Sequence, residues 1–176
     1  MRLRGWTLLA IVAFLAPALA HAAPADTAVT TVILVRHAEK NTEWAGADQP
    51  LSAAGMLRAQ ELAHVLGKTD IASIYVTPWA RTRQTAEPLA RLLGDSLTVV
   101  DSIDATVRGV LGHHGSTVLV VGHSNTVPQI LARLTGNREL ESLAVGYDDL
   151  FVVTLDPRRP PRWLRLRYGA VPVSAH

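Results

Sequence analysis

Short runs of aliphatic and β-branched residues recur along this chain, with segments of helical pattern between them. Strands that are apolar almost throughout are buried on both faces, as in a parallel sheet that helices cover on each side. The pattern therefore predicts an α/β fold of three layers with a mainly parallel sheet. The expected strands are Thr31–Arg36, Ile71–Val76, Leu97–Val100 and Thr117–Val121, and the expected helices run from Ser52 to Gly67, over residues 79–93, from Ile103 to Leu111 and from Thr126 to Leu134.

The last part of the chain has a different pattern. Leu150–Leu155 and Trp163–Tyr168 are typical of two strands, and the proline-rich turn 156–161 joins them. We therefore expect an antiparallel hairpin at one edge of the sheet. Residues 23–176 fit a single domain in length, and their sequence contains no internal repeat.

Residues 1–22 have the layout of a secretory signal peptide. Arg2 and Arg4 precede the apolar segment Trp6–Leu19, and small residues follow up to Ala22. The apolar segment has about 14 residues, fewer than the roughly 20 that span a bilayer. We expect cleavage after Ala22 and a bacterial protein of the periplasm or the exterior, with a retained membrane anchor as the alternative.

Charge and cysteine content exclude several classes of function. Removal of residues 1–22 takes away two arginines and no acidic residue, so the 17 basic and 15 acidic residues become 15 and 15. A formally neutral chain gives no support to a nucleic-acid partner. The absence of cysteine excludes disulfides, thiol catalysis and cysteine-ligated metals, and it suits an oxidising compartment.

Two of the expected strands end at a histidine. Thr31–Arg36 runs into His37, and Thr117–Val121 is followed by a glycine and His123. Ligands bind beyond the carboxyl ends of the strands in parallel sheets, so we expect both histidines in one crevice. The segment after the strand Ile71–Val76 adds Arg81 to the same rim.

These motifs resemble the histidine phosphatase superfamily in its phosphoglycerate-mutase-like branch. That family has Arg-His-Gly at the end of the first strand, where this chain has Arg36-His37-Ala38. The family's Ser-Pro-x-x-Arg-Ala-x-Gln-Thr-Ala segment is similar to residues 77–86, with two substitutions, and its Val-x-His is similar to residues 121–123. Leu51-Ser52-x-x-Gly55 is also similar to the family. The resemblance covers most of the chain after residue 22 and implies a phosphoglycerate-mutase-like fold.

The resemblance implies a phosphatase in which His37 is the nucleophile and becomes phosphohistidine. Phosphoryl transfer needs positive donors around the phosphoryl oxygens, and Arg36 and Arg81 can supply forked hydrogen bonds there. We expect His123 to donate to the same oxygens. The reacting nitrogen of His37 needs a lone pair, so its other nitrogen is expected to donate to a backbone carbonyl. Because these cations neutralise the phosphoryl group, no metal or cofactor is expected.

The general acid that protonates the leaving oxygen is harder to assign. The related enzymes place a carboxylate after the second helix, where this chain has Asp101 and Asp104. We expect Asp101 to be the acid because it directly follows a strand, although a role as N-cap of the next helix explains it as well. Glu39 is a competitor close to the nucleophile, and an ion pair with Lys40 or Arg83 explains it equally.

Three other functions remain open. A serine hydrolase would use residues 122–126 as a nucleophile elbow, but that motif needs glycine where Thr126 stands. A zinc site of His37, Glu39 and His123 lacks the paired cysteines of the deaminase pattern. A non-catalytic module that binds phosphate or a phosphosugar would keep the arginines and need no acid, so it is the main alternative.

The short loops between the motifs indicate an open pocket. Water can enter such a pocket, which favours a phosphatase over a mutase that must retain its phosphoryl group. The expected partner is a phosphorylated small molecule or an envelope glycolipid, for example a phosphosugar or a lipopolysaccharide-core phosphate. Attraction of the terminal hairpin to anionic lipid is a weaker hypothesis, since its arginines are most simply a solvated face. These arginines are Arg158, Arg159, Arg162, Arg165 and Arg167.

Overall fold

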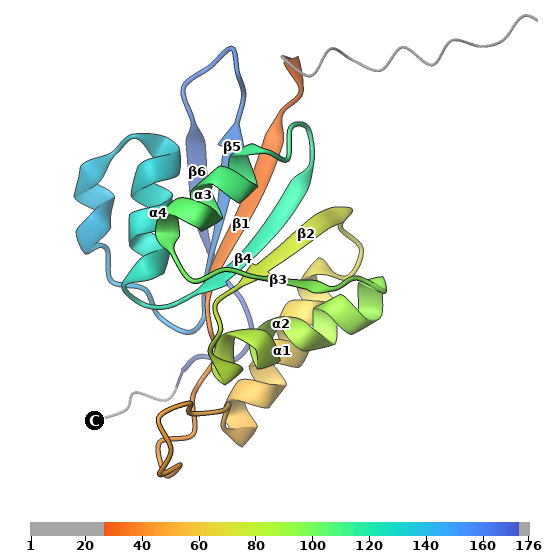
Figure 1. Ribbon diagram of the computed structural model, residues 1–176, viewed down its shortest axis with the longest axis vertical. Coiled ribbons are helices and arrows are strands. Elements are labelled where there is room, and N and C mark those ends of the chain that lie inside the picture. The colour runs from red at the N-terminus through yellow and green to blue at the C-terminus, as the bar shows by residue number, and fades with distance from the viewer. Residues whose placement is uncertain (1–26, 173–176) are drawn as a thin grey trace, which may run out of the picture.

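A six-stranded sheet in the order β3-β2-β4-β1-β5-β6 forms the middle layer of the protein (Figure 1). The computed structural model describes residues 27–172, so the expected signal peptide lies outside the described residues. The strands are β1 (Thr30–Arg36), β2 (Ile71–Val76), β3 (Leu97–Val99), β4 (Thr117–Gly122), β5 (Asp149–Leu155) and β6 (Arg162–Arg167). The helices are α1 (Ala53–Leu66), α2 (Ala80–Leu93), α3 (Ile103–Leu111) and α4 (Thr126–Thr135), followed by the 3-10 helix Arg138–Ser142.

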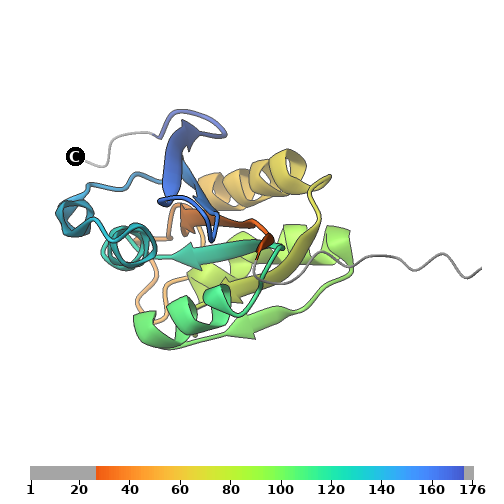
Figure 2. The ribbon, with the colours of Figure 1, turned by 90° about the horizontal axis from the view of Figure 1, so that it is seen from above.

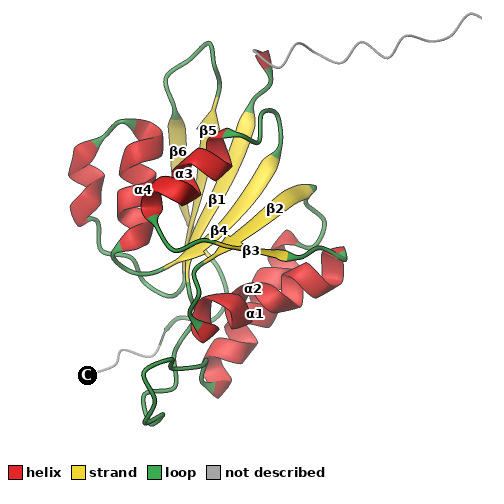
Figure 3. Cartoon of the chain, viewed as in Figure 1, coloured by secondary structure: helices red, strands yellow, loops and turns green. Residues whose placement is uncertain are grey.

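The sheet is parallel in one part and antiparallel in the other. β1 pairs in parallel with β4, β4 with β2, and β2 with β3. β5 runs antiparallel to β1, and β6 antiparallel to β5. The mainly parallel sheet with a terminal hairpin at one edge is therefore confirmed. The carboxyl ends of β1, β2 and β4 meet at one edge of the sheet (Figure 3).

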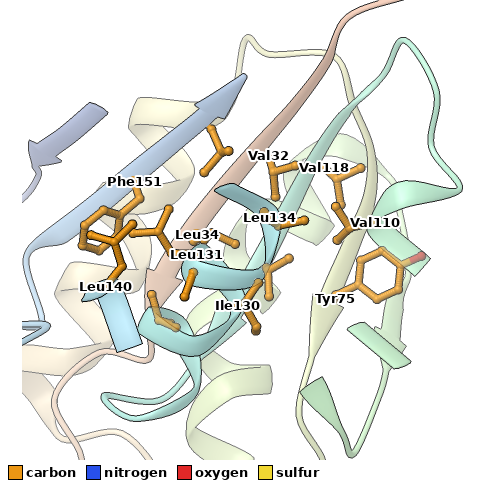
Figure 4. Packing of buried hydrophobic residues seen from close by; sticks show 14 of the residues in the cluster. Val32, Leu34, Tyr75, Val110, Val118, Ile130, Leu131, Leu134, Leu140 and Phe151 are labelled. Carbon is orange, nitrogen blue, oxygen red and sulfur yellow. The ribbon is translucent and has the colours of Figure 1, made fainter. Parts of the chain in front are cut away.

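Helices cover both faces of the sheet, α1 and α2 on one and α3 and α4 on the other (Figure 2). Alternate residues of β1 pack against the two helical layers, because successive side chains of a strand point to opposite faces of the sheet. Val32 and Leu34 join the cluster under α4, which Figure 4 shows, and Ile33 and Val35 join the cluster under α1 and α2. This two-sided burial explains the unbroken apolar pattern of the strand.

Local signals set the helix ends near the candidate site. Ser52 caps α1, since its hydroxyl accepts a hydrogen bond from the Gly55 amide at 3.1 Å. A Cβ on Gly55 would lie 2.2 Å from the Glu39 carbonyl oxygen, so only glycine lets α1 approach the loop after β1. α2 ends at Gly94, whose φ of 69° is the left-handed conformation that glycine favours.

The expected strands and helices agree with these bounds to within a residue or two at each end. The 3-10 helix Arg138–Ser142 was not predicted, because its five residues are too few to show a helical repeat. No helix within residues 27–172 has both the length and the apolar character to cross a membrane.

Candidate active site

The carboxyl ends of β1, β2 and β4 open into a cavity of about 540 Å³. The cavity brings together the four positions that the sequence indicated for phosphate chemistry, Arg36, His37, Arg81 and His123. The ring centroids of the two histidines are 5.3 Å apart, and the rings meet edge to face. Lys40, Gln49, Thr77, Trp79, Asp101 and Asn125 are among the other residues that line it.

His37 is buried, and one of its ring nitrogens forms a hydrogen bond with the backbone. Its side chain is 5% exposed, and its Nδ1 lies 2.7 Å from the carbonyl oxygen of Ala38. A carbonyl only accepts, so Nδ1 carries the proton and Nε2 keeps the lone pair. This is the arrangement that the sequence analysis expected for a nucleophile. Burial, together with the charges of Arg36, His123 and Arg81, lowers the pKa of His37 to about 3, so the ring is neutral near pH 7.

Arg36 is fixed by contacts that leave its charge without a carboxylate partner among residues 27–172. Its Nη1 donates to the Val145 carbonyl at 3.0 Å, and its guanidinium lies 3.9 Å from the centroid of the Tyr147 ring. Its buried Nε has no hydrogen-bond partner within residues 27–172. A buried N–H without a partner lowers the stability of the protein, because the group has lost its hydrogen bonds to water. An anion that accepted a hydrogen bond from Nε would remove that penalty.

Tyr147 is a site residue that the sequence analysis missed. Its ring covers the guanidinium of Arg36 and lies 5.9 Å from the ring of His37, centroid to centroid. It belongs to the loop before β5, and since β5 runs antiparallel to β1, this loop arrives beside the end of β1. No local motif signals this position.

Arg81 reaches the cavity from the first turn of α2. Its guanidinium lies 4.6 Å from the centroid of the Trp79 ring. Burial lowers the pKa of Arg81, while Asp48 and Tyr147 act in the opposite direction. Asp48 accepts a hydrogen bond from the Ala80 amide at 2.7 Å and so ties the loop after β1 to the start of α2. Within the part of the chain that the structure describes, no carboxylate lies within ion-pair distance of Arg81.

A row of hydroxyl groups sets the proton position on His123. Thr82 Oγ1 lies within 2.9 Å of the carbonyl oxygens of Thr77 and Trp79, so its hydroxyl proton is donated to a carbonyl. Thr77 Oγ1 then donates to Thr82 Oγ1 at 2.9 Å and accepts from His123 Nε2 at 3.0 Å. Neutral His123 therefore carries its proton on Nε2. Burial, followed by the charges of Arg81 and Arg36, lowers its pKa to about 4.

Asp101 is the carboxylate that faces the cavity. It is exposed and is the one acidic residue in the cavity lining among residues 27–172. The N-cap explanation for Asp101 is wrong, because Ser102 caps α3 by accepting from the Ala105 amide. Asp104 forms an ion pair with Arg133 and does not line the cavity, so its candidacy as the acid is overturned.

Glu39 turns away from the cavity. Arg58 Nε lies 3.0 Å from both carboxylate oxygens of Glu39, and its Nη2 lies 2.7 Å from Oε1. The expected ion pair with Lys40 or Arg83 is wrong, since Arg58 engages the whole carboxylate. Arg58 also donates to the carbonyls of Tyr168 and Ala170. Glu39 is thus a structural link between the loop after β1 and the segment after β6.

The zinc site of His37, Glu39 and His123 is not assembled. Glu39 is engaged by Arg58, and residues 27–172 contain no group of three or more acidic, histidine or cysteine side chains placed to hold a metal ion.

Comparisons with known proteins bear on the family and the fold. Residues 32–105 match the family model described as "Histidine phosphatase superfamily (branch 1)". A search of curated proteins finds no match.

Solved structures match over most of the chain. The protein histidine phosphatase SixA complexed with tungstate is 22% identical, with 78% of this chain and 96% of that chain covered and a TM-score of 0.66. A mycobacterial glucosyl-3-phosphoglycerate phosphatase is 15% identical, with 81% and 100% covered and a TM-score of 0.61. Phosphoserine phosphatase from Entamoeba histolytica, in complex with 3-phosphoglyceric acid, is 16% identical, with 81% and 98% covered and a TM-score of 0.61. At these identities the structures establish the fold.

Proposed function

Because the chain belongs to the histidine phosphatase superfamily, we propose that it is a phosphatase that hydrolyses phosphomonoesters through a phosphohistidine on His37, without a metal. One observation carries the proposal. The Nδ1–H of His37 donates to the Ala38 carbonyl, which leaves Nε2 as a nucleophile in a pocket with two arginines that form no ion pair with a carboxylate of residues 27–172.

In the first step Nε2 of His37 attacks phosphorus. The Nε2–P bond forms as the bond from phosphorus to the leaving oxygen breaks, and that oxygen takes a proton from Asp101. Arg36 and Arg81 neutralise the phosphoryl oxygens, where preorganised donors act most strongly in a partly buried site. The negative charge of the bound phosphate raises the pKa of His123 and so acts against burial and the two arginines, which lower it. In that complex His123 becomes a cation that donates to Thr77 and to a phosphoryl oxygen.

In the second step water attacks the phosphohistidine. The Nε2–P bond breaks, inorganic phosphate forms, and the proton from water passes to the Asp101 carboxylate, which restores the acid. Splitting one displacement into two avoids the direct attack of water on an unactivated ester. Asp101 is exposed and lies at the cavity wall, so water can reach it in this step.

The test is release of phosphate from p-nitrophenyl phosphate by the purified protein in EDTA, beside His37→Ala. We expect turnover that survives EDTA and is lost in the variant, together with acid-labile phosphate on the wild-type protein in a rapid quench. Turnover that His37→Ala retains would overturn the proposal.

The main alternative is a non-catalytic module of the same fold that binds phosphate or a phosphosugar. It predicts no turnover with any ester, combined with a phosphate-dependent rise in the unfolding temperature that Arg81→Ala removes. The two functions thus give opposite results in the turnover assay, whereas both predict the phosphate-dependent stabilisation.

For the substrate we propose a phosphosugar or an envelope glycolipid such as a lipopolysaccharide-core phosphate. The open pocket and its exposed Asp101 support a phosphate that projects from a larger molecule. We also propose that the protein acts in the periplasm or outside the cell, on the basis of the leader-like residues 1–22. Fractionation of cells that express the full chain would test the location.

A further inference from the structure

We call the cavity lined by Arg36, His37, Arg81 and His123 the phosphate pocket. A second cavity, of about 240 Å³, lies beside it between α3 and α4. The two cavities share Thr77, Asp101 and Thr126 in their linings. We call the second cavity the α3–α4 slot. Ile130 of α4 and Tyr75 of β2, two of the residues that line it, lie on this face of the sheet in Figure 4. Its aliphatic lining on this face of the sheet consists of Val100, Ile103, Val120 and Ile130.

The hydroxyl groups in the wall of the slot are already paired within the protein. Thr106 Oγ1 donates to the Ser102 carbonyl at 2.9 Å, and Tyr75 Oη lies 3.0 Å from Nε2 of His113. Thr126 Oγ1 accepts from the His123 amide at 2.8 Å. These groups have little hydrogen bonding left for a sugar, so the slot favours an apolar occupant.

Asp101 connects the slot to the reaction. In the proposed function the leaving oxygen must come within hydrogen-bond distance of Asp101, the one carboxylate in the described lining of the phosphate pocket. Asp101 also lines the slot. The group attached to the leaving oxygen therefore begins at the mouth of the slot.

We propose that the α3–α4 slot is the subsite for the leaving group, and that the preferred substrates are phosphate monoesters whose alcohol carries an alkyl chain or an aromatic ring next to the ester. This inference rests on the proposed phosphatase function and replaces its phosphosugar and lipopolysaccharide-core substrates with an apolar alcohol, because a sugar next to the ester leaves the slot unused. A dry cavity of about 150 Å³ lined by aliphatic and aromatic side chains is enough to hold benzene. The slot is larger, and a six-carbon group fits its volume.

The first test is a series of n-alkyl phosphates from ethyl to hexyl. Their leaving alcohols have nearly equal acidity, so the chemical barrier stays constant while the apolar length grows. We expect kcat/KM to rise roughly three-fold for each methylene, or about eighty-fold from ethyl to hexyl phosphate. Hydrolysis of the whole series at equal kcat/KM would overturn the subsite and leave the phosphatase proposal intact.

A matched pair of substitutions locates the effect. Val100 lines the slot, whereas its neighbour Val99 is 52% exposed and lies outside the lining. We expect Val100→Phe to lower the hexyl-to-ethyl ratio of kcat/KM by at least about ten-fold, and Val99→Phe to leave that ratio unchanged. An unchanged ratio in a Val100→Phe protein that still unfolds cooperatively would contradict the assignment.

Binding tests the slot without turnover. Ethylphosphonate and hexylphosphonate place the same alkyl groups next to a phosphoryl group that cannot be hydrolysed. We expect hexylphosphonate to raise the unfolding temperature more than ethylphosphonate at equal concentration, and Val100→Phe to abolish the difference. Equal shifts in the wild-type protein would overturn the slot even if no ester proves to be a substrate.

Discussion

Arginine side chains gather in two regions of the protein, the phosphate pocket and the β5–β6 hairpin, and the two regions treat the charge in opposite ways. In the pocket, Arg36 and Arg81 lie against the rings of Tyr147 and Trp79. Among the described residues neither has a carboxylate within ion-pair distance.

In the hairpin the charges are paired with buried carboxylates. Arg165 donates to both oxygens of Asp149 at 2.7 Å, and Arg167 lies 2.5 Å from Asp148. Asp149 is fully buried and Asp148 is 4% exposed. The hairpin is therefore not simply the solvated face that the sequence analysis expected for all five of its arginines. The comparison teaches that unneutralised charge, rather than the number of arginines, marks an anion site.

Substitution in the pocket gives the largest expected effect, and it falls on activity. Arg81→Ala removes a donor aimed at the phosphoryl oxygens, and we expect kcat/KM for p-nitrophenyl phosphate to fall about a thousand-fold. The unfolding free energy should stay the same or rise, because the loss relieves repulsion within the pocket. Arg165→Ala, the matched change in the hairpin, should retain kcat/KM within a few-fold. A loss below ten-fold for Arg81→Ala would remove the distinction between the regions.

Substitution in the hairpin is expected to act on stability instead. Arg165→Ala leaves the Asp149 carboxylate buried and short of a partner, and we expect unfolding in urea to require about 2–3 kcal/mol less. The value lies below that for a fully buried pair, because the Arg165 side chain is 34% exposed. Adding Asp149→Asn removes the charge and should recover part of the loss. A stable single variant would mean that the hairpin pairs contribute as little as surface ion pairs do.

The smallest expected effect is a difference in pH dependence. Burial lowers the pKa of His37 to about 3 from its ordinary 6.5, so the unfolded chain binds more protons than the folded chain in that interval. The contribution of neutral His37 to the free energy of unfolding is fully present above the pKa that the histidine has in the unfolded chain. It is lost as the pH falls toward the pKa of His37 in the folded protein. Compared with His37→Gln, the wild-type protein should lose about 1 kcal/mol more between about pH 7 and pH 5.5.

In the same experiment, the hairpin residue Asp149 should affect stability in a different pH range from the pocket residue His37. Hydrogen bonds from Arg165 and Gly146 hold its pKa below 3.8, against the opposing effect of burial. Its contribution is therefore lost only at more acid pH than that of His37. Parallel curves for wild type and His37→Gln would show that the histidine is not held neutral by the fold.

Much of the fold could be predicted because its signals are local. Ser52 and Gly94 mark helix ends through their own backbone requirements, and the apolar strands follow from burial on both faces. His37 and His123 could be placed together because parallel strands that pair directly end at the same edge of the sheet. These inferences need only the sequence near each residue and one rule of topology.

The remaining features depend on contacts between distant segments. Tyr147 reaches the pocket only because β5 pairs with β1, a choice that the hairpin's own sequence does not reveal. Glu39 pairs with Arg58 because Gly55 lets α1 approach closely, and the partner 19 positions away is not marked by any local pattern. The geometry also reduced the three candidate acids to Asp101, since the other two carboxylates are engaged outside the pocket.

The pairing of β1 has a consequence for how the chain reaches its native state. This first strand lies between β4 and β5, and its partners are residues 117–122 and 150–155. Closing such long loops slows folding, and neither neighbour exists while the ribosome is still making the first half of the protein. The strand that leads into His37 therefore waits for most of the chain to be synthesised. The pocket forms late, as one event with the closing of the sheet.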